Sequence, residues 1–257
     1  MLDIPYRIVI PTAKVWFKAM DLRFQMSGYE HIPKKGGALL AVNHISYVDF
    51  ILAGFAAEQQ KRLTRFMAKR EMFDTPGLGT FMRSLHHIRV DRGEGLESYH
   101  EAVRYLRDGE IVGIFPEATI SRSFQIKELK TGAVRIAAEA GVPLIPVVLW
   151  GTQRLKTKDH ERDFSRHKTI AITTGAPLHP TGENAAKETA ELKAVMEQML
   201  DATIRNYPAD EQPPGSWWLP ASYGGGAPTP ERAKELDAQE LAARAAARRA
   251  KAEAKRK

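Results

Sequence analysis

The stretch ALLAVNHISYVD, residues 38–49, decides the fold of this chain of 257 residues. Its five apolar residues, 38–42, follow the pair Gly36-Gly37 and predict a short strand that is buried on both faces. A helical pattern, 48–58, comes directly after it. A buried strand followed by a helix is the repeating unit of a parallel sheet with helices on its faces.

The same alternation continues on both sides of this stretch. Strand-like runs are Ala38–Val42, Thr64–Ala68, His87–Val90, Ile111–Phe115, Leu144–Leu149 and Thr169–Thr174. Helical patterns lie between them at 48–58, 94–107, 130–140 and 185–205. The sequence therefore predicts an α/β fold with a mostly parallel central sheet flanked by helices, preceded by an N-terminal amphipathic helical segment.

Composition divides the chain into four segments. They are an amphipathic helix in 1–30, the α/β domain in 31–206, a Pro/Gly-rich linker in 207–230 and a basic, alanine-rich tail in 231–257. The first segment interleaves apolar and cationic side chains, which is typical of a helix at a membrane interface and equally of a helix packed on its own core. These residues are Val15, Trp16, Phe17, Met20 and Phe24, with Lys14, Lys18 and Arg23. The tail predicts a solvated helix or a disordered segment, and binding to anionic lipid is its other interpretation.

The charge is concentrated in the tail. The chain carries 38 Lys and Arg against 31 Asp and Glu, and residues 241–257 hold seven of the basic residues and one acid. The folded part is nearly neutral, which disfavours nucleic-acid binding. The absence of cysteine excludes disulfides, thiolate zinc sites and a cysteine nucleophile. No apolar run approaches the roughly 18–20 residues that span a bilayer.

A histidine and an aspartate follow the first strand of the quoted stretch. His44 lies just past the strand, and Asp49 lies one turn into the next helix. The imidazole can take a proton near neutral pH, and the carboxylate can fix its tautomer, so the pair suits general-base catalysis. The spacing recurs at His86 and Asp91, and spacing alone leaves both pairs open.

Other polar side chains also follow predicted strands. In FPEATIS, residues 115–121, Glu117 and Thr119 are ligand groups or part of a capped turn. Arg92 follows Val90-Asp91. Its planar guanidinium is suited to binding a phosphate group, and the alternative is that it is a solvated surface side chain. Lys69 has the same two interpretations.

In this order and spacing, four stretches resemble the motifs of the glycerolipid acyltransferase superfamily, specifically its 1-acyl-glycerol-3-phosphate acyltransferases. The motif Asn-His-x4-Asp is matched by Asn43, His44 and Asp49. The second motif is matched by 90–92, Phe-Pro-Glu-Gly-Thr-Arg-Ser by 115–121, and Val-Pro-Ile/Val-x-Pro-Val by 142–147. The resemblance covers about residues 25–180 and favours His44/Asp49 over the second pair, because only this pair follows a strand and carries the preceding asparagine.

The chain departs from the family pattern around the acceptor's phosphate. Ala118 stands where the third motif has glycine, and Ile120 where it has the arginine thought to act near that phosphate. Arg122, two residues later, is the candidate substitute. His87, beside His86, stands where the second motif usually has glycine, and we expect both histidines to be structural or to line a pocket.

The resemblance implies an enzyme of phospholipid biosynthesis that moves a fatty acyl group from acyl-CoA or acyl carrier protein to the hydroxyl of a lysophosphatidic-acid-like acceptor. His44 would be the general base and Asp49 would orient it. The implied substrate-binding residues are Arg92, Glu117, Thr119, Arg122 and Lys69. The resemblance implies no metal and no tightly bound cofactor, and a peripheral position on the anionic cytoplasmic face of a membrane. The alternatives are glycerol 3-phosphate, another lysophospholipid or a glycolipid as acceptor and, in another class, an inactive membrane-surface adaptor.

Overall fold

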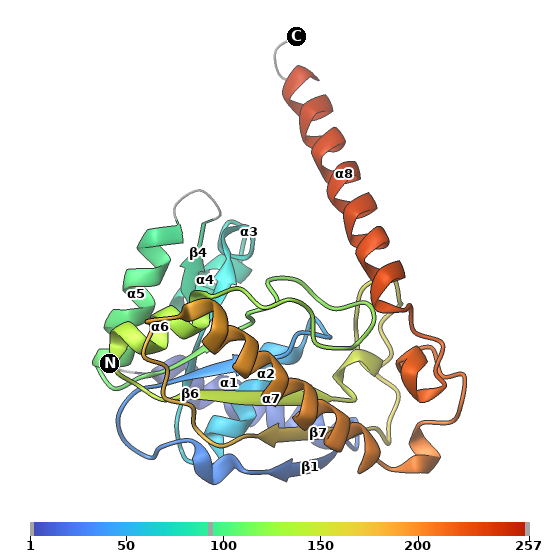
Figure 1. Cartoon of the computed structure of the whole chain (residues 1–257), viewed down its shortest axis with the longest axis horizontal. Coiled ribbons are helices and arrows are strands. Elements are labelled where there is room, and N and C mark those ends of the chain that lie inside the picture. The colour runs from blue at the N-terminus through green and yellow to red at the C-terminus, as the bar shows by residue number, and fades with distance from the viewer. Residues whose placement is uncertain (1–2, 92–94, 255–257) are drawn as a thin grey trace.

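A seven-stranded sheet lies between two layers of helices in the computed structural model, which describes residues 3–91 and 95–254 (Figure 1). The strands are β1 Arg23–Ser27, β2 Ala38–Val42, β3 Thr64–Lys69, β4 Ile88–Val90, β5 Ile111–Ile114, β6 Leu144–Trp150 and β7 Thr169–Thr174. The helices are α1 Ile4–Ala19, α2 Asp49–Glu58, α3 Arg70–Phe73, α4 Leu78–Ser84, α5 Gly95–Arg107, α6 Gly132–Ala140, α7 Ala185–Arg205 and α8 Pro230–Ala254. Short 3-10 turns are η1 Tyr29–His31, η2 Thr152–Arg154, η3 Ala209–Glu211 and η4 Ala221–Tyr223.

The strand order is β1-β7-β6-β2-β5-β3-β4. The strands from β6 to β4 pair in parallel, β7 pairs antiparallel with β6, and β1 pairs in parallel with β7. The mostly parallel α/β sheet is therefore confirmed. The antiparallel pair reverses the direction of the two strands at one edge.

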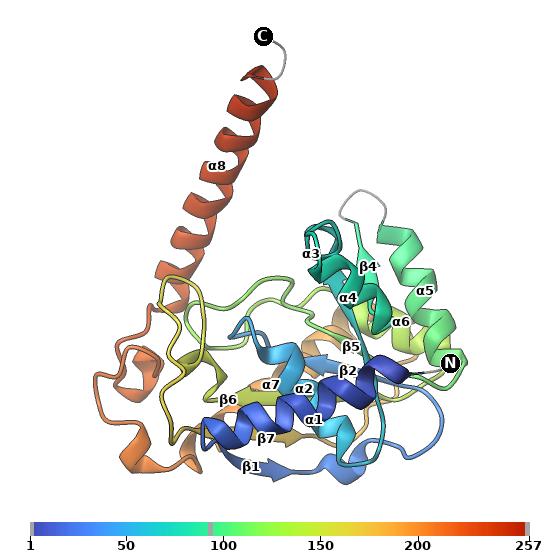
Figure 2. The ribbon, with the colours of Figure 1, turned by 180° about the vertical axis from the view of Figure 1, so that it is seen from behind.

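The alternation of side chains along β2 divides the core into two layers. Leu39 and Ala41 face a layer formed with α5, α6 and α7. Leu40 and Val42 face a layer formed with α1 and α2, which cross the opposite side of the sheet (Figure 2). Because every residue of β2 is fully buried, this strand lies at the centre of the fold, as its apolar sequence predicts.

The N-terminal segment is joined to the sheet more closely than a separate helix would be. Within residues 1–30 lies the edge strand β1, which was not predicted because Phe24 was assigned to the amphipathic helix, although the sequence Arg-Phe-Gln-Met-Ser alternates polar and apolar residues. Phe17 of α1 is buried in the core, and so is Met20, which directly follows the helix. The core-packed interpretation therefore holds for these two side chains, whereas Val15 is 69% exposed.

The segment 207–230 packs on the domain, although its Pro and Gly content is typical of a linker. Trp218, Leu219 and Tyr207 belong to the same buried layer as α7. Trp218 stacks at an angle against Trp150, with ring centroids 5.9 Å apart. Aromatic burial of this kind holds an irregular segment in place without regular secondary structure.

The tail forms the long helix α8, which projects from the body in both views (Figures 1 and 2). In the described part of α8, Ala233 is the buried side chain and the positions 241–247 are exposed. Among the helices of residues 3–91 and 95–254, none is long and apolar enough to cross a membrane.

Candidate active site

The site lies where three neighbouring parallel strands end. Strand β2 lies between β5 and β6, and all three deliver polar residues from their carboxyl ends. The helix after β2 covers one face of the sheet and the helix after β5 covers the other. Such a change of side leaves a crevice at the strand ends, where ligands bind in α/β sheets.

His44 and Asp49 meet at the end of β2, as their spacing predicts. His44 Nδ1 lies 3.0 Å from Asp49 Oδ2. The backbone between them folds back over the carboxylate, because the N–H groups of Ile45 and Ser46 each donate to Oδ2 at 2.7 Å. Asp49 is the first residue of α2 and is fully buried, so its position is set by the chain turn as well as by the histidine.

Thr152 completes the environment of the buried carboxylate. Its hydroxyl donates to Asp49 Oδ1 at 2.6 Å, and both residues are fully buried. Thr152 follows β6, so it reaches Asp49 from the neighbouring strand. Sequence reasoning missed it, because only the strand order places residue 152 beside residue 49.

Among the described residues, no hydrogen bond occupies the second ring nitrogen of His44, Nε2. An ionised Asp49 only accepts, so Nδ1 carries a proton and Nε2 of the neutral ring has a free lone pair. The imidazole stacks on Phe115 with centroids 4.3 Å apart, and its side chain is 21% exposed. The arrangement can therefore accept a proton from a bound hydroxyl group.

Glu117 supports the loop of His44. Its Oε1 accepts the His44 N–H at 2.8 Å and its Oε2 accepts the Lys127 N–H at 3.0 Å. The residue is only 4% exposed, and burial raises the pKa of its carboxyl to about 8, against the opposing effect of these hydrogen bonds. In the structure the carboxyl group of Glu117 thus accepts hydrogen bonds from backbone groups on both sides, and its expected role in substrate binding stays a prediction.

Asn43 joins the central strand to its neighbour. Its amide side chain donates to the Leu149 carbonyl at 3.1 Å and accepts the Leu149 N–H at 2.7 Å. These two hydrogen bonds take the place of backbone–backbone hydrogen bonds between β2 and β6. They explain why the residue before His44 is an asparagine, whose side chain can both donate and accept.

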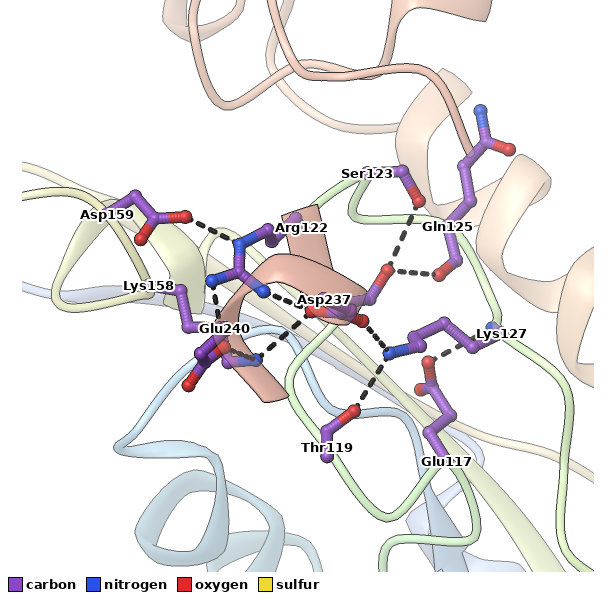
Figure 3. A network of polar contacts seen from close by, with 11 residues as sticks. Glu117, Thr119, Arg122, Ser123, Gln125, Lys127, Lys158, Asp159, Asp237 and Glu240 are labelled. Atoms are coloured by element: carbon purple, nitrogen blue, oxygen red, sulfur yellow. Dashed lines mark hydrogen bonds and ion pairs between the residues drawn. The ribbon is translucent and has the colours of Figure 1, made fainter. Parts of the chain in front are cut away.

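The two predicted residues after Glu117 lie in a network of ion pairs (Figure 3). Thr119 Oγ1 accepts a hydrogen bond from Lys127 Nζ at 2.8 Å. Arg122 is 8% exposed and forms ion pairs with Asp159, at 2.6 Å, and with Asp237 and Glu240 of α8. Arg122 is thus beside the site, and carboxylates surround it.

Lys69 and Arg92 are the remaining predicted phosphate contacts. Lys69 ends β3, two strands from β2, and pairs in register with Val90. Arg92 lies outside the described residues. Among the described residues no group of His, Asp and Glu has the arrangement of a metal site.

In the part of the chain that the structure describes, no hydrogen bond or ion pair joins His86 to Asp91, the second His-x4-Asp pair. Asp91 accepts from Arg70 at 2.8 Å and from Arg89 at 3.3 Å. His87 is buried, and its Nδ1 accepts the Phe66 N–H at 3.0 Å. Burial lowers the pKa of His87 to about 4, so the ring is neutral at pH 7.

An apolar cavity of about 480 Å³ lies on the side of α1 and α2. Aromatic side chains of both helices and of β3 line it, with His87 at one wall. Phe66 is one of them, and its ring stacks with Phe115 at 5.9 Å. Two ring contacts therefore connect the cavity wall to His44.

The comparisons with known proteins agree with this architecture. A family model described as Acyltransferase matches residues 23–150. The 1-acyl-sn-glycerol-3-phosphate acyltransferase of Bacillus subtilis is 31% identical over 177 residues, which cover 68% of this chain and 83% of the relative. The protein of the same name from Limnanthes douglasii is 29% identical over 215 residues, which cover 82% of this chain and 72% of the relative.

A solved structure shares the fold. The crystal structure of the 1-acyl-sn-glycerophosphate (LPA) acyltransferase, PlsC, from Thermotoga maritima superposes with a TM-score of 0.60 at 24% identity, covering 74% of this chain and 75% of that one. The sheet and the matched family model define an α/β acyltransferase. More narrowly, the chain belongs to the 1-acyl-sn-glycerol-3-phosphate acyltransferase family, so the family indicated by the four motifs is confirmed.

Proposed function

We propose that this chain transfers a fatty acyl group from a thioester, on coenzyme A or acyl carrier protein, to the free hydroxyl of a lysophosphatidic-acid-like acceptor. The observation that carries the proposal is the His44–Asp49 contact of 3.0 Å at the end of β2. The names of the relatives support the choice of reaction and of acceptor.

In the proposed mechanism, Nε2 of His44 takes the proton of the acceptor hydroxyl as its oxygen attacks the thioester carbon. The tetrahedral intermediate then collapses: the C–S bond breaks, an ester remains on the acceptor, and the leaving sulfur takes the proton back from Nε2. Asp49 holds the imidazole in the required tautomer and stabilises the imidazolium between the two steps. The steps require no resident cofactor, since the thioester is a co-substrate.

The apolar cavity is the proposed site of the acyl chain. Phe50, Phe55 and Phe66 are among its lining residues. In β5, a Cβ on Gly113 would lie 2.4 Å from the ring of Phe66, so the glycine makes room for this wall. The stack from Phe66 through Phe115 to His44 would align the thioester with the base when the chain occupies the cavity.

Arg122 is the proposed contact for the acceptor's phosphate. Ile120, at the position of the family's arginine, is 4% exposed and so contributes an apolar wall. Arg122 is two residues further and only partly accessible through its present carboxylate partners. A guanidinium can hold phosphate through two parallel hydrogen bonds.

We also propose that the protein works on a membrane surface, at the cytoplasmic face where acyl donors are made. Ile4, Ile8, Pro11 and Val15 follow one another at helical spacing on α1, and all four are exposed. This stripe replaces the buried Phe17 as the proposed anchor, because an exposed apolar row is available to lipid.

The test is an acyl-transfer assay with two thioester donors, a fatty acyl group on coenzyme A and the same group on acyl carrier protein. The four acceptors are lysophosphatidic acid, glycerol 3-phosphate, lysophosphatidylcholine and monoacylglycerol. We expect transfer to lysophosphatidic acid, loss of about 10²–10⁴ in kcat for His44→Ala, and nearly full activity for His86→Ala. If no combination of donor and acceptor gives transfer, the alternative of an inactive membrane-surface adaptor is favoured. Equal loss in both histidine variants would contradict the choice of base.

A further inference from the structure

Three cations lie next to the loop that carries His44, and only Arg122 among them has a proposed role above, as the contact for the acceptor's phosphate. We name Arg122, Lys127 and Lys158 the cationic cluster (Figure 3). Their exposed side-chain fractions are 7%, 25% and 11%. Cations this enclosed normally have an anionic partner, because leaving them unpaired costs solvation energy.

Each member of the cluster is tied to the loop that carries His44. The residue before Arg122, Ser121, donates its N–H to the His44 carbonyl at 2.7 Å. The N–H of Lys127 and the N–H of His44 share the carboxylate of Glu117. These contacts fix two cations on the side of the catalytic histidine.

The third cation, Lys158, is held by the segment that follows the neighbouring strand β6. The carbonyl of Lys156 accepts the Ser46 hydroxyl at 2.6 Å and the Tyr47 N–H at 3.0 Å. Thr157 donates to the Ile45 carbonyl at 2.7 Å. Lys158 follows directly, so the loop between His44 and Asp49 separates the two attachments of the cluster.

The anions that occupy the cluster come from α8. Asp237 forms ion pairs with all three cations, and Glu240 with Arg122 at 2.9 Å and Lys158 at 2.9 Å. The two acids are three positions apart and so project from one side of the helix. Partial burial acts to raise the pKa of Glu240, but hydrogen bonds from Lys158 and Arg122 lower it to about 2. Burial also acts to raise the pKa of Asp237, but its contacts with Lys127 and Lys158 hold it below its usual value, so both carboxylates are charged at neutral pH.

The charge and geometry of this contact match a phosphate group. With Asp159 retained, the cluster has two positive charges that α8 neutralises. A phosphate monoester carries about −1.5 to −2 at pH 7 and three acceptor oxygens. Two carboxylates on adjacent turns offer the same charge and the same kind of acceptor.

An anionic ligand could also displace α8 from the domain at little cost. Of its described side chains only Ala233 is buried, so ion pairs rather than apolar area hold the helix. Toward its C-terminal end the helix extends away from the domain (Figures 1 and 2). An anionic ligand that binds the same cations can therefore replace α8 without exposing a core.

We propose that the cationic cluster is a phosphate-monoester site beside His44, and that Asp237 and Glu240 occupy it in the ligand-free chain, so that α8 and a phosphorylated substrate compete for it. The inference rests on the proposed function in taking the ligand to be a substrate. The phosphate is that of the lipid acceptor or that of coenzyme A, and the experiment distinguishes the two.

The first measurement follows α8 without any catalysis. The chain has no cysteine, so Ala190→Cys on α7 and Ala242→Cys on α8 give a unique pair of spin labels. In the His44→Ala background we expect one narrow distance without ligand. Lysophosphatidic acid or coenzyme A should broaden it, and monoacylglycerol or dephospho-coenzyme A should not. Displacement by the lipid assigns the acceptor's phosphate, displacement by coenzyme A assigns the donor's, and displacement by neither overturns the proposal.

The second measurement is kinetic. Asp237→Asn with Glu240→Gln removes the competitor, and we expect KM for the displacing substrate to fall about tenfold with kcat unchanged. Glu231→Gln with Glu235→Gln removes the same number of charges from α8 outside the cluster and should leave KM unchanged. Equal KM values in both double variants and the wild type would overturn the competition. The spin-label distance can be measured even if the chain has no transferase activity. Failure of the proposed function and failure of the proposed competition are therefore distinguishable.

Discussion

Replacing Thr152 by valine tests whether the dyad depends on its buried support. The substitution keeps the side-chain shape and removes the hydroxyl that donates to Asp49 Oδ1 at 2.6 Å. Among the described residues no other hydrogen bond reaches this oxygen, since the remaining donors bind Oδ2. The variant therefore leaves half of a fully buried carboxylate without a partner.

The size of the effect follows from the charge on the acceptor. Hydrogen bonds to charged groups contribute about 1.5–3 kcal/mol to stability. For a domain of this size, at about 2–4 °C per kcal/mol, Tm should fall by about 3–12 °C. The carboxylate can regain a donor only by rotating away from His44, so part of the general-base contribution, about 10²–10⁴ in rate, is lost. We expect kcat to fall about ten- to hundredfold.

The assay compares kcat and KM for acyl transfer in three variants. Thr152 touches Asp49 rather than substrate, so KM for the acceptor should stay unchanged, and Thr152→Ser should restore kcat. Thr157→Val is the matched control: this buried threonine donates to the Ile45 carbonyl at 2.7 Å, on the same loop. It should lower Tm while changing kcat by about twofold or less.

Two results would refute this reasoning. Unchanged kcat in Thr152→Val, despite a lower Tm, would make the hydroxyl purely structural. An equal loss of kcat in Thr157→Val would mean that any loosening of the loop impairs the enzyme and that the contact with Asp49 is not special.

Three further predictions concern a carboxyl, a backbone conformation and the membrane. The pKa of Glu117 is raised from 4.5 to about 8, so its contribution to stability is full below pH 4.5 and is lost as the pH rises toward 8. Urea unfolding should show the wild type losing stability relative to Glu117→Gln across this range, and a difference independent of pH would contradict the shift. Ala118 has a φ of 60°, so Ala118→Gly should raise the free energy of unfolding by about 0.5–1 kcal/mol, whereas destabilisation would show that the methyl group is needed. Ile8→Ser with Val15→Ser should release the protein from anionic liposomes at every salt concentration, while deletion of 241–257 should weaken sedimentation only at low salt; sedimentation of the first variant at high salt would rule out α1 as the anchor.

The sequence predicts those parts of the site that are local. His44 and Asp49 are one turn apart, so the motif and the strand before it suffice to place them together. Strands such as β2 and β6 are visible because both of their faces are buried and their sequences are apolar throughout. A single sequence predicts well the contacts between residues that are close in the chain and the strands that are buried on both faces.

The parts that were missed depend on distant contacts. Thr152 and Lys158 reach the His44 loop only because β6 pairs with β2. No local sequence pattern predicts which strands pair. Asp237 lies in a segment without an apolar face, so the sequence gives no sign that the helix touches the domain at all. For Glu117, the motif indicates importance but not whether the carboxylate faces a substrate or the backbone.

The edge position of β1 has a consequence for biosynthesis. Among the strands of the described sheet, β1 leaves the ribosome before the others, yet its neighbour is β7, and its Arg23 pairs with Thr169. All the intervening strands can pair earlier in translation, so the sheet closes at this edge only after residue 174 has emerged. During that interval the nascent chain carries an unpaired strand directly behind α1 and its exposed apolar stripe. A ribosome working near a bilayer would therefore offer the amino-terminal helix to lipid before the catalytic domain is complete, and membrane contact would precede the final step of folding.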